Sequence, residues 1–245
     1  MILSTNIAET SVTVPGVRYV IDQGKAKIKQ FRSKLSLDSL LVKPISRSSA
    51  DQRKGRAGRE AAGHCFRLYQ QSAYDGLDAA TQPEILRCDL SAAVLTMKAR
   101  GVDDVLNFPF LTPPNRKVME KALFSLLQLG ALDDKTLAIT TTGRKTARLP
   151  LTPAHGRVLI EAATESSACL PEVIDIVACL SVESIFLPTE TEESRESAAT
   201  ARAQLFRRSG DHLTLLSAVQ SYAAESSDRK TFAQKHLLSL SLIHI

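Results

Sequence analysis

Residues 52–59 constrain the fold of this chain more than any other stretch, because they carry four cations and two glycines in the run QRKGRAGR. Ser48 is predicted to cap a helix start here, with Asp51 three residues on capping it in return. On that helix Gln52, Arg56 and Arg59 share one face at i, i+4 and i+7. Two planar guanidinium groups on one face suit the oxygens of a polyphosphate.

A solvated basic helix or a nuclear-import run is the alternative interpretation of the same stretch. The two glycines argue against it, since each glycine costs about 1 kcal/mol in a helix interior. The sequence therefore favours a phosphate-binding helix.

The charge of the chain is concentrated at one end. Residues 1–71 hold 13 Lys and Arg against 5 Asp and Glu, whereas the remainder holds 18 against 21. A block of +8 beside a remainder of −3 indicates a polyanionic partner on one domain. The length of 245 residues and the 44% hydrophobic content are sufficient for two or three compact domains.

The cysteines and histidines do not have the spacing of metal ligands. The 4 cysteines form no CxxC pair and the 5 histidines are scattered, so we expect reduced thiols and no metal site. No signal peptide or apolar run of membrane-spanning length is found, which favours a soluble protein inside the cell. The apolar ends, residues 1–3 and 239–245, suggest a fragment of a longer chain.

The first 71 residues are predicted to be α/β in character. Short strands are expected at residues 1–4, 17–22 and 63–69, by their apolar, β-branched and aromatic content. Residues 25–31 alternate charged with small or apolar residues, and residues 40–44 fit the partner strand of a hairpin whose tip lies near residues 33–38. This basic hairpin could wedge against nucleic acid, although a charged edge strand that discourages aggregation fits equally well.

Residues 4–13 are expected to form a loop of hydroxyls and amides at the carboxyl end of the first strand, where ligands gather in open α/β sheets. A Ser- and Thr-rich turn that caps a helix is the alternative.

The rest of the chain is predicted to be mainly helical. Asp89 should cap a helix over residues 90–100 that Gly101 ends, and Pro113 and Pro114 should open a second helix that ends at Gly130. A short strand at residues 137–140 and a turn at Thr142 and Gly143 follow, in the order typical of a winged helix. Further helices are expected at residues 153–163, 171–180 and after Asp211, with residues 190–196 as a solvated acidic connection.

Two of these stretches together resemble motifs of a known family. Residues 4–13, STNIAETSVT, look like motif V of the DEAH-box ATP-dependent RNA helicases, and residues 52–59 look like their motif VI, Q-R-x-G-R-A-G-R. Residues 24–46 are similar to the family's hairpin segment, and residues 210–216, GDHLTLL, resemble the signature of its ratchet-like domain.

The resemblance implies roles for individual residues. Gln52 would position the attacking water, and Arg56 and Arg59 would be arginine fingers at the γ-phosphate. Ser11 and Thr13 match the nucleotide side of motif V, and Thr5 and Asn6 match its RNA-backbone side. Lys25 and Lys27 of the hairpin are further candidates for RNA contact. The implied cofactor is ATP with Mg²⁺, whose ligands lie mainly in a first RecA-like domain, since no G-x-x-x-x-G-K-[ST] loop and no Asp-Glu-Ala-His box occur here.

The same resemblance implies three domains: part of RecA-like domain 2 (residues 1–71), a linker and winged helix (72–150), and a truncated ratchet-like domain (151–245). The fold class is thus α/β followed by mainly α. Two departures weaken the match at its end, because residues 207–209 replace the usual loop and residues 232–245 lack the expected aromatic, basic helix.

The implied activity is 3′ to 5′ movement on RNA driven by ATP hydrolysis, with this fragment inactive alone. A noncatalytic RNA-binding or scaffold protein is the alternative, and a DNA helicase is disfavoured by the motif V residues. By family association the partners are RNA and a glycine-rich activator protein, with no membrane. The protein would act as a monomeric motor within ribonucleoprotein assemblies of the nucleus or nucleolus.

Overall fold

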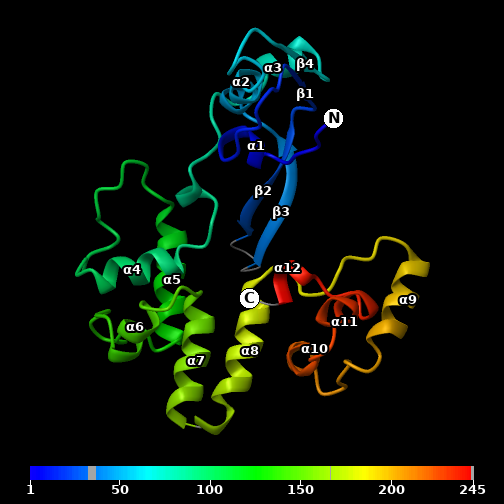
Figure 1. Ribbon diagram of the computed structural model, residues 1–245. Coiled ribbons are helices and arrows are strands. Elements are labelled where there is room, and N and C mark those ends of the chain that lie inside the picture. The colour runs from blue at the N-terminus through cyan, green and yellow to red at the C-terminus, as the bar shows by residue number, and fades with distance from the viewer. Residues whose placement is uncertain (33–36, 166, 244–245) are drawn as a thin grey trace. The chain divides into compact units, whose positions relative to one another are not determined.

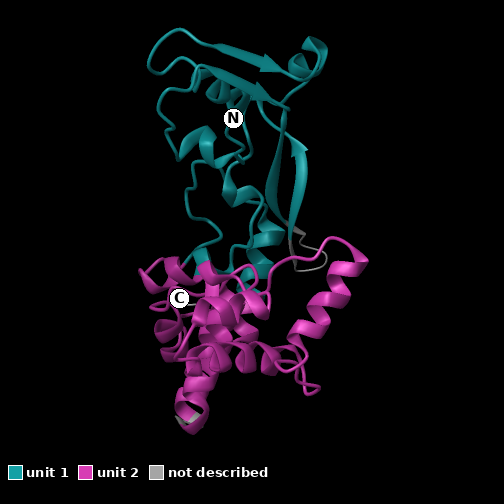
Figure 2. Cartoon of the chain, turned by 45° about the vertical axis from the view of Figure 1, so that its right-hand side comes forward, with its two compact units in different colours: residues 1–94, 104–124 teal, residues 95–103, 125–245 magenta. Residues whose placement is uncertain are grey.

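The computed structural model describes residues 1–32, 37–165 and 167–243 (Figure 1). The chain divides into two compact units (Figure 2). Unit 1 comprises residues 1–94 and 104–124, and unit 2 comprises residues 95–103 and 125–245. The boundaries between the units fall inside two helices, α4 (Ser91–Ala99) and α5 (Arg116–Gln128). Among the described residues, strands β1–β4 lie in unit 1, and unit 2 is helical apart from two isolated bridges, so the predicted order of α/β followed by mainly α is confirmed at this level.

Unit 1 holds a pair of parallel strands, β1 (Tyr19–Asp22) and β4 (His64–Arg67), in register from Tyr19 opposite His64 to Asp22 opposite Arg67. Gly63, just before β4, has no room for a side chain, because a Cβ would meet the carbonyl oxygen of Ala57 at 2.2 Å. Both predicted strands are therefore present, in shorter form.

The predicted hairpin is also confirmed. Strands β2 (Lys25–Arg32) and β3 (Leu37–Pro44) pair in antiparallel fashion, with Lys25 opposite Pro44 and Lys27 opposite Val42. Of the predicted tip, residues 33–36 lie outside the described residues, while residues 37 and 38 belong to β3.

The predicted strand at residues 1–4 is wrong. Met1, Ile2 and Leu3 are at least 67% exposed and belong to no strand of the described chain. An apolar run forms a buried strand only where neighbouring strands satisfy its backbone groups, and neither β1 nor β4 pairs with it. Residues 7–10 form a one-turn helix, α1 (Ile7–Thr10), inside the expected loop, so the turn-and-helix alternative describes this stretch better.

Helix α2 (Arg47–Gly55) carries the first half of the QRKGRAGR run and begins earlier than predicted. Its N-cap is Ser46, whose hydroxyl accepts a hydrogen bond from the backbone of Ser49 at 3.1 Å, so the predicted cap at Ser48 is wrong. The helix ends at Gly55. A short helix, α3 (Gln71–Asp75), and a 3-10 turn, η1 (Glu84–Leu86), follow β4.

The start signal of α4 and the stop signals of α4 and α5 function as predicted, whereas α5 begins only at Arg116, after Asn115, whose side chain accepts a hydrogen bond from the backbone of Lys117 at 2.9 Å. The Asp89 carboxylate accepts a hydrogen bond from the backbone of Ser91 at 3.1 Å, just at the start of α4. Gly101 and Gly130 follow the two helices with φ of 89° and 66°, a backbone region that suits glycine. The apolar stripe of α5 is buried at Ala122, Leu123 and Leu126, with Met119 in addition.

In unit 2 the predicted strand at residues 137–140 is reduced to a single bridge between Leu132 and Ile139. The predicted turn at Thr142 and Gly143 is instead the first turn of helix α6 (Thr141–Thr146). Thr140 caps this helix, since its hydroxyl oxygen accepts a hydrogen bond from the backbone of Gly143 at 3.0 Å. The Thr-rich sequence therefore starts a helix at the place of the predicted turn.

The remaining helices of unit 2 include those predicted after Pro153, Pro171 and Gly210. The acidic stretch is not a connection but the first turn of α9, where Thr191 and Ser194 form a capping box and acidic side chains complement the helix dipole. Asp211 is the first residue of α10 rather than its cap. The bounds are α7 (Pro153–Glu165), η2 (Ser167–Cys169), α8 (Leu170–Ser181), α9 (Glu192–Arg202), α10 (Asp211–Ala224), α11 (Arg229–Lys235) and α12 (Leu240–Ile243).

The core of unit 2 includes the end of the chain. Leu238 is 2% exposed and Ile243 is 6% exposed, and both pack in one cluster with Ile185, Ala218 and Tyr222. The apolar character of residues 238–243 thus reflects burial.

Among the described residues, all four cysteines are free and no group of His, Cys, Asp and Glu is arranged to hold a metal ion. None of the helices in the described ranges has the length and apolar content that crossing a membrane requires.

Candidate nucleotide and RNA site

A buried carboxylate, Asp22 at the end of β1, lies at the centre of the candidate site. Its side chain is fully buried and accepts three hydrogen bonds. The donors are the Arg53 guanidinium at 2.8 Å, the Tyr69 hydroxyl at 3.0 Å and the backbone N–H of Gly24 at 2.9 Å. A buried charge is tolerated only when it is paired and hydrogen-bonded in this way.

Arg53 joins the two motif-bearing segments. Besides Asp22, its guanidinium donates to the Glu9 carboxylate at 2.9 Å and to the carbonyl oxygen of Lys25 at 3.2 Å. Burial alone would lower the pKa of Arg53, but the hydrogen bonds that it donates to the Asp22 and Glu9 carboxylates outweigh this effect and hold the pKa above its ordinary value. The helix α2 is therefore tied to α1, to β1 and to the base of the hairpin.

The phenol of Tyr69 completes this network. Burial, together with the hydrogen bond that it donates to Asp22, raises the pKa of Tyr69 to about 12. Its ring also packs against Gly24, where a Cβ would lie 2.7 Å from the ring and where φ is 73°. Only glycine fits at this turn between β1 and β2.

Sequence reasoning missed Asp22, Arg53 and Tyr69. Asp22 ends the apolar strand β1, and that position is a signal from which a buried acid could have been predicted. Arg53, however, is indistinguishable by sequence from the other cations of its helix.

Two contacts link the end of the QRKGRAGR run to the segment before β1. The Arg59 guanidinium donates to the hydroxyl oxygen of Thr13, and the Glu60 carboxylate accepts from the backbone of Gly16 at 3.0 Å. Of the predicted nucleotide-side pair, Thr13 thus contacts a predicted finger. The Ser11 hydroxyl instead lies 3.4 Å from that of Thr10.

The expectation that Gln52, Arg56 and Arg59 share one helix face is only partly met. Because α2 ends at Gly55, Arg56 is its C-cap and Arg59 lies beyond the helix. Two glycines in four residues explain the early end, since glycine is a poor helix former. Gln52 remains exposed on the last full turn.

Arg56 carries an unsatisfied nitrogen. Its Nη1 atom is buried and makes no hydrogen bond to any described residue. An unsatisfied buried donor of a charged group is costly, and native proteins rarely leave one without a partner. The nitrogen fits an anionic oxygen such as that of a phosphate.

The predicted RNA-contacting residues are exposed, and no contact joins them directly. Thr5 and Asn6 immediately precede α1, and the Asn6 side chain makes no capping hydrogen bond. Lys25 and Lys27 project from one face of the hairpin, where exposed Val42 lies opposite Lys27. Because they are exposed, these polar groups are accessible to the sugar-phosphate backbone of an RNA strand.

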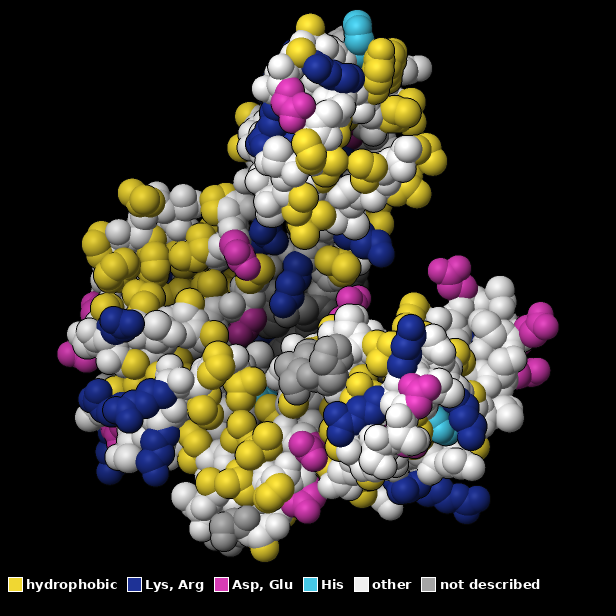
Figure 3. Space-filling model, in the orientation of Figure 1, with side chains coloured by type: hydrophobic (Ala, Val, Ile, Leu, Met, Phe, Trp, Pro, Cys, Tyr) yellow, Lys and Arg dark blue, Asp and Glu magenta, His cyan; other side chains and the backbone are white. Residues whose placement is uncertain are grey.

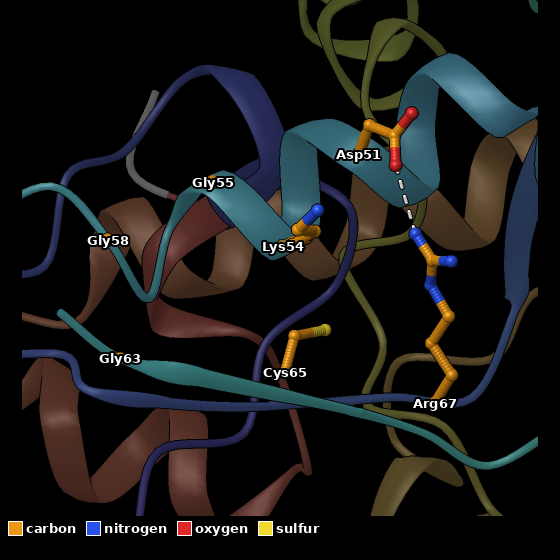
Figure 4. A pocket seen from close by; sticks show the side chains of 7 residues that line it. All are labelled: Asp51, Lys54, Gly55, Gly58, Gly63, Cys65 and Arg67. Atoms are coloured by element: carbon orange, nitrogen blue, oxygen red, sulfur yellow. Dashed lines mark hydrogen bonds and ion pairs between the residues drawn. The ribbon is translucent and has the colours of Figure 1, made fainter.

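A cavity of about 560 Å³ lies beside α2 and β4 (Figure 4). Figure 4 shows the contact between Arg67 and Asp51, 2.9 Å long, at one side of it, with Lys54 and Cys65 near its middle. Burial and the nearby Asp22 raise the pKa of Cys65, so its thiol stays protonated at neutral pH and is a poor nucleophile. The remaining lining residues are Gly55, Gly58 and Gly63.

Comparison with known proteins agrees with the motif resemblance. Residues 152–215 match the family described as helicase associated domain (HA2), ratchet-like. The chain is 45% identical over 217 residues to the pre-mRNA-splicing factor ATP-dependent RNA helicase DEAH10 of Arabidopsis thaliana, covering 89% of this chain and 30% of that protein.

Two further relatives are named as probable helicases. The probable ATP-dependent RNA helicase DHX35 of Homo sapiens is 36% identical over 239 residues, which cover 98% of this chain and 33% of that protein. The probable ATP-dependent RNA helicase DHR2 of Saccharomyces cerevisiae is 47% identical over 196 residues, which cover 80% of this chain and 26% of that protein. The chain spans about a third or less of the length of these relatives. With motifs V and VI in order and a ratchet-like match behind them, the chain belongs to the DEAH-box family of ATP-dependent RNA helicases.

Proposed function

We propose that the chain supplies the arginine-finger half of an ATP-hydrolysing site, together with RNA contacts, in an ATP-dependent RNA helicase that moves 3′ to 5′ on RNA. The observation that carries this proposal is the buried Nη1 of Arg56, a cationic donor without an acceptor among the described residues. ATP with Mg²⁺ would supply the chemistry, with the metal ligands contributed mainly by another domain.

In this proposal the residues of this chain stabilise the transition state of hydrolysis and orient the attacking water. Arg56 and Arg59 hold positive charge where negative charge spreads over the γ-phosphate oxygens, and Gln52 orients the attacking water. Thr13, held by Arg59, and Ser11 line the nucleotide side of the site. The buried pair of Arg53 and Asp22 keeps the segments that carry these groups in fixed register.

The RNA contacts lie on a different part of unit 1. The hydroxyl of Thr5 and the amide of Asn6 would hydrogen-bond to the RNA backbone, and the lysines of the hairpin would neutralise its phosphates. The domain assignment extends this proposal: residues 1–71 as part of RecA-like domain 2, residues 72–150 as linker and winged helix, and residues 151–245 as a truncated ratchet-like domain. The family match to residues 152–215 supports the last of these.

A chimaera tests the proposal. The aligned segment of the Arabidopsis relative is replaced by this chain, and RNA-stimulated ATP hydrolysis is measured. We expect hydrolysis, and we expect Arg56→Ala to lower turnover by roughly 10³-fold or more while sparing nucleotide binding, because a finger acts on the transition state. The matched control is Arg47→Ala, which removes an exposed cation from the start of α2 and away from the cavity.

Unchanged turnover in the Arg56 variant would refute the finger assignment. A chimaera that binds RNA without hydrolysing ATP would favour a noncatalytic RNA-binding scaffold. Hydrolysis by the isolated chain would contradict the claim that half of the site lies elsewhere.

The proposed setting is a nuclear ribonucleoprotein, in keeping with the name of the Arabidopsis relative, a pre-mRNA-splicing factor. A monomeric motor stimulated by a glycine-rich activator protein completes the proposal. Fluorescence microscopy of the tagged protein tests the nuclear location, and an exclusively cytoplasmic signal would refute it.

A further inference from the structure

Unit 2 carries a cluster of cations that no part of the proposed site uses. Residues 135–160 contain five Lys and Arg and no Asp or Glu. Three of the five, Arg144, Lys145 and Arg148, lie on α6 and the turn that continues it. We call this set the α6 triad.

The three side chains of the α6 triad project from one side of a helical turn. Arg148 continues the helical path, since its backbone N–H donates to the carbonyl oxygen of Lys145 at 3.2 Å. Positions i, i+1 and i+4 fall within roughly 100° of a helix circumference. All three side chains are exposed, and Figure 3 shows dark blue side chains gathered where Figure 1 labels α6.

The opposite side of α6 is held tightly against the rest of unit 2. Gly143 approaches the chain so closely that a Cβ would meet the carbonyl oxygen of Ala131 at 2.1 Å. A Cβ at Gly156 of α7 would lie 2.9 Å from the methyl group of Thr146. The hydroxyl of Thr140, which caps α6, also donates to the carbonyl oxygen of Gly130 at 2.7 Å. The α6 triad is thus presented outward by a helix of fixed orientation.

No carboxylate neutralises the α6 triad in the described part of the chain. Two acids precede it: Asp133 accepts hydrogen bonds from Thr136 and from the backbone of Lys135, and Asp134 is exposed and forms no ion pair with the α6 triad. The nearest acid after it, Glu161, pairs with Arg157. The positive charge of the α6 triad is therefore left without an ion pair among the described residues.

The composition of this surface favours a phosphodiester backbone over an acidic protein segment. The exposed residues of 141–148 are the α6 triad and Thr141, with no apolar side chain among them. Protein interfaces have an apolar centre and are depleted in Lys. Phosphate contacts instead need cations and hydroxyls, and the Arg fork matches phosphate geometry.

We infer that the α6 triad is a second RNA-backbone contact surface, in unit 2 and separate from the RNA contacts proposed for unit 1. The inference rests on the proposed function for its partner, an RNA strand. Its recognition is independent of base sequence, because phosphates carry no sequence information.

The experiment measures binding of the full chain to a fluorescent oligouridylate of 20 nucleotides across a salt series. In the triple variant Arg144→Ala, Lys145→Ala, Arg148→Ala, we expect the plot of log K against log salt to be shallower by about 2, because three single-strand phosphate contacts contribute about 0.7 each. A slope change of about 2 means that the triple variant should bind the oligonucleotide roughly 100-fold more weakly than the wild type at 0.1 M salt.

The matched control removes the same charge from exposed positions elsewhere in unit 2: Arg195→Ala, Lys230→Ala, Lys235→Ala. It should leave the slope unchanged. Replacing both arginines of the triad by lysine should preserve most of the slope, since charge is retained, and circular dichroism establishes that each variant is folded.

The outcomes separate this inference from the proposed function. If the wild-type chain binds no RNA, both are refuted. If it binds and the triad variant keeps the wild-type slope, only the α6 triad inference is refuted. Binding of poly-glutamate as tightly as RNA, with the same loss in the triad variant, would assign the surface to an acidic protein instead.

Discussion

The bond between Arg53 and Asp22 offers the most direct test of how motif VI is held. We expect Arg53→Met, which keeps the length of the side chain and removes its charge, to destabilise unit 1 by about 3 kcal/mol. Breaking a buried ion pair by removing one partner typically costs 3–5 kcal/mol, because the other charge is left buried and uncompensated.

The structure places the cost near the lower end of that range. The side chain of Asp22 is fully buried, and that of Arg53 is 14% exposed. The carboxylate would still keep two neutral donors, the backbone of Gly24 and the hydroxyl of Tyr69. Glu9, 12% exposed, would lose its ion pair but lies closer to solvent.

The assay is hydrogen exchange of unit 1 backbone amides under urea, because two compact units need not unfold together. The matched control is Asp51→Asn, which breaks the pair with Arg67. Its carboxylate is 58% exposed, so the loss should stay below about 1 kcal/mol. Adding Asp22→Asn to Arg53→Met should recover part of the loss, because the buried charge is then gone.

An Arg53→Met variant no less stable than the Asp51 control would refute this reasoning. Additive effects of the Arg53 and Asp22 substitutions would show that the two side chains are not coupled.

Two further predictions concern residues of unit 1. The raised pKa of Tyr69 means that the folded state holds the phenolic proton more tightly than the unfolded state does. Its stabilising contribution should therefore be complete below pH 10 and be lost as the pH rises through about 12. Ultraviolet titration should find one phenol that ionises near pH 12 and is missing in Tyr69→Phe; if the variant titrates like the wild type, the assignment is wrong. Gly63→Ala should cost about 1–3 kcal/mol by overpacking, whereas Gly58→Ala, with open space around its Cβ, should be neutral within about 0.5 kcal/mol in urea unfolding; equal effects would contradict the steric argument.

Local signals predicted the helices well. Gly101 and Gly130 end α4 and α5 where the sequence places them, and the Asp89 carboxylate accepts a hydrogen bond from the backbone N–H of Ser91 at the start of α4. Such signals act within a few residues of the position that they determine. The antiparallel hairpin was predictable for the same reason, since alternation and proximity in sequence define it.

Predictions failed where distant segments decide the outcome. An apolar run at residues 1–4 cannot be recognised as an exposed segment until its neighbours are known. Gly143 is typical of a turn in the sequence, but it lies in the first turn of α6, where the absence of a side chain permits close packing against Ala131. The apolar tail from residue 239 showed no recognisable period, yet Ile243, together with Leu238 just before the tail, packs in the core of unit 2.

The sequence by itself determined the family, the hairpin and the identity of the phosphate-binding candidates, because these depend on residue types at short spacing. Only the tertiary structure decided which cation of the run QRKGRAGR is held in ion pairs. Arg53 is fixed by Asp22, 31 residues earlier, and by Glu9, 44 residues earlier, whereas Arg56 keeps a nitrogen without a partner among the described residues. The physical reason is that desolvation and pairing depend on the three-dimensional surroundings of a side chain, which neighbouring residues in the sequence do not specify.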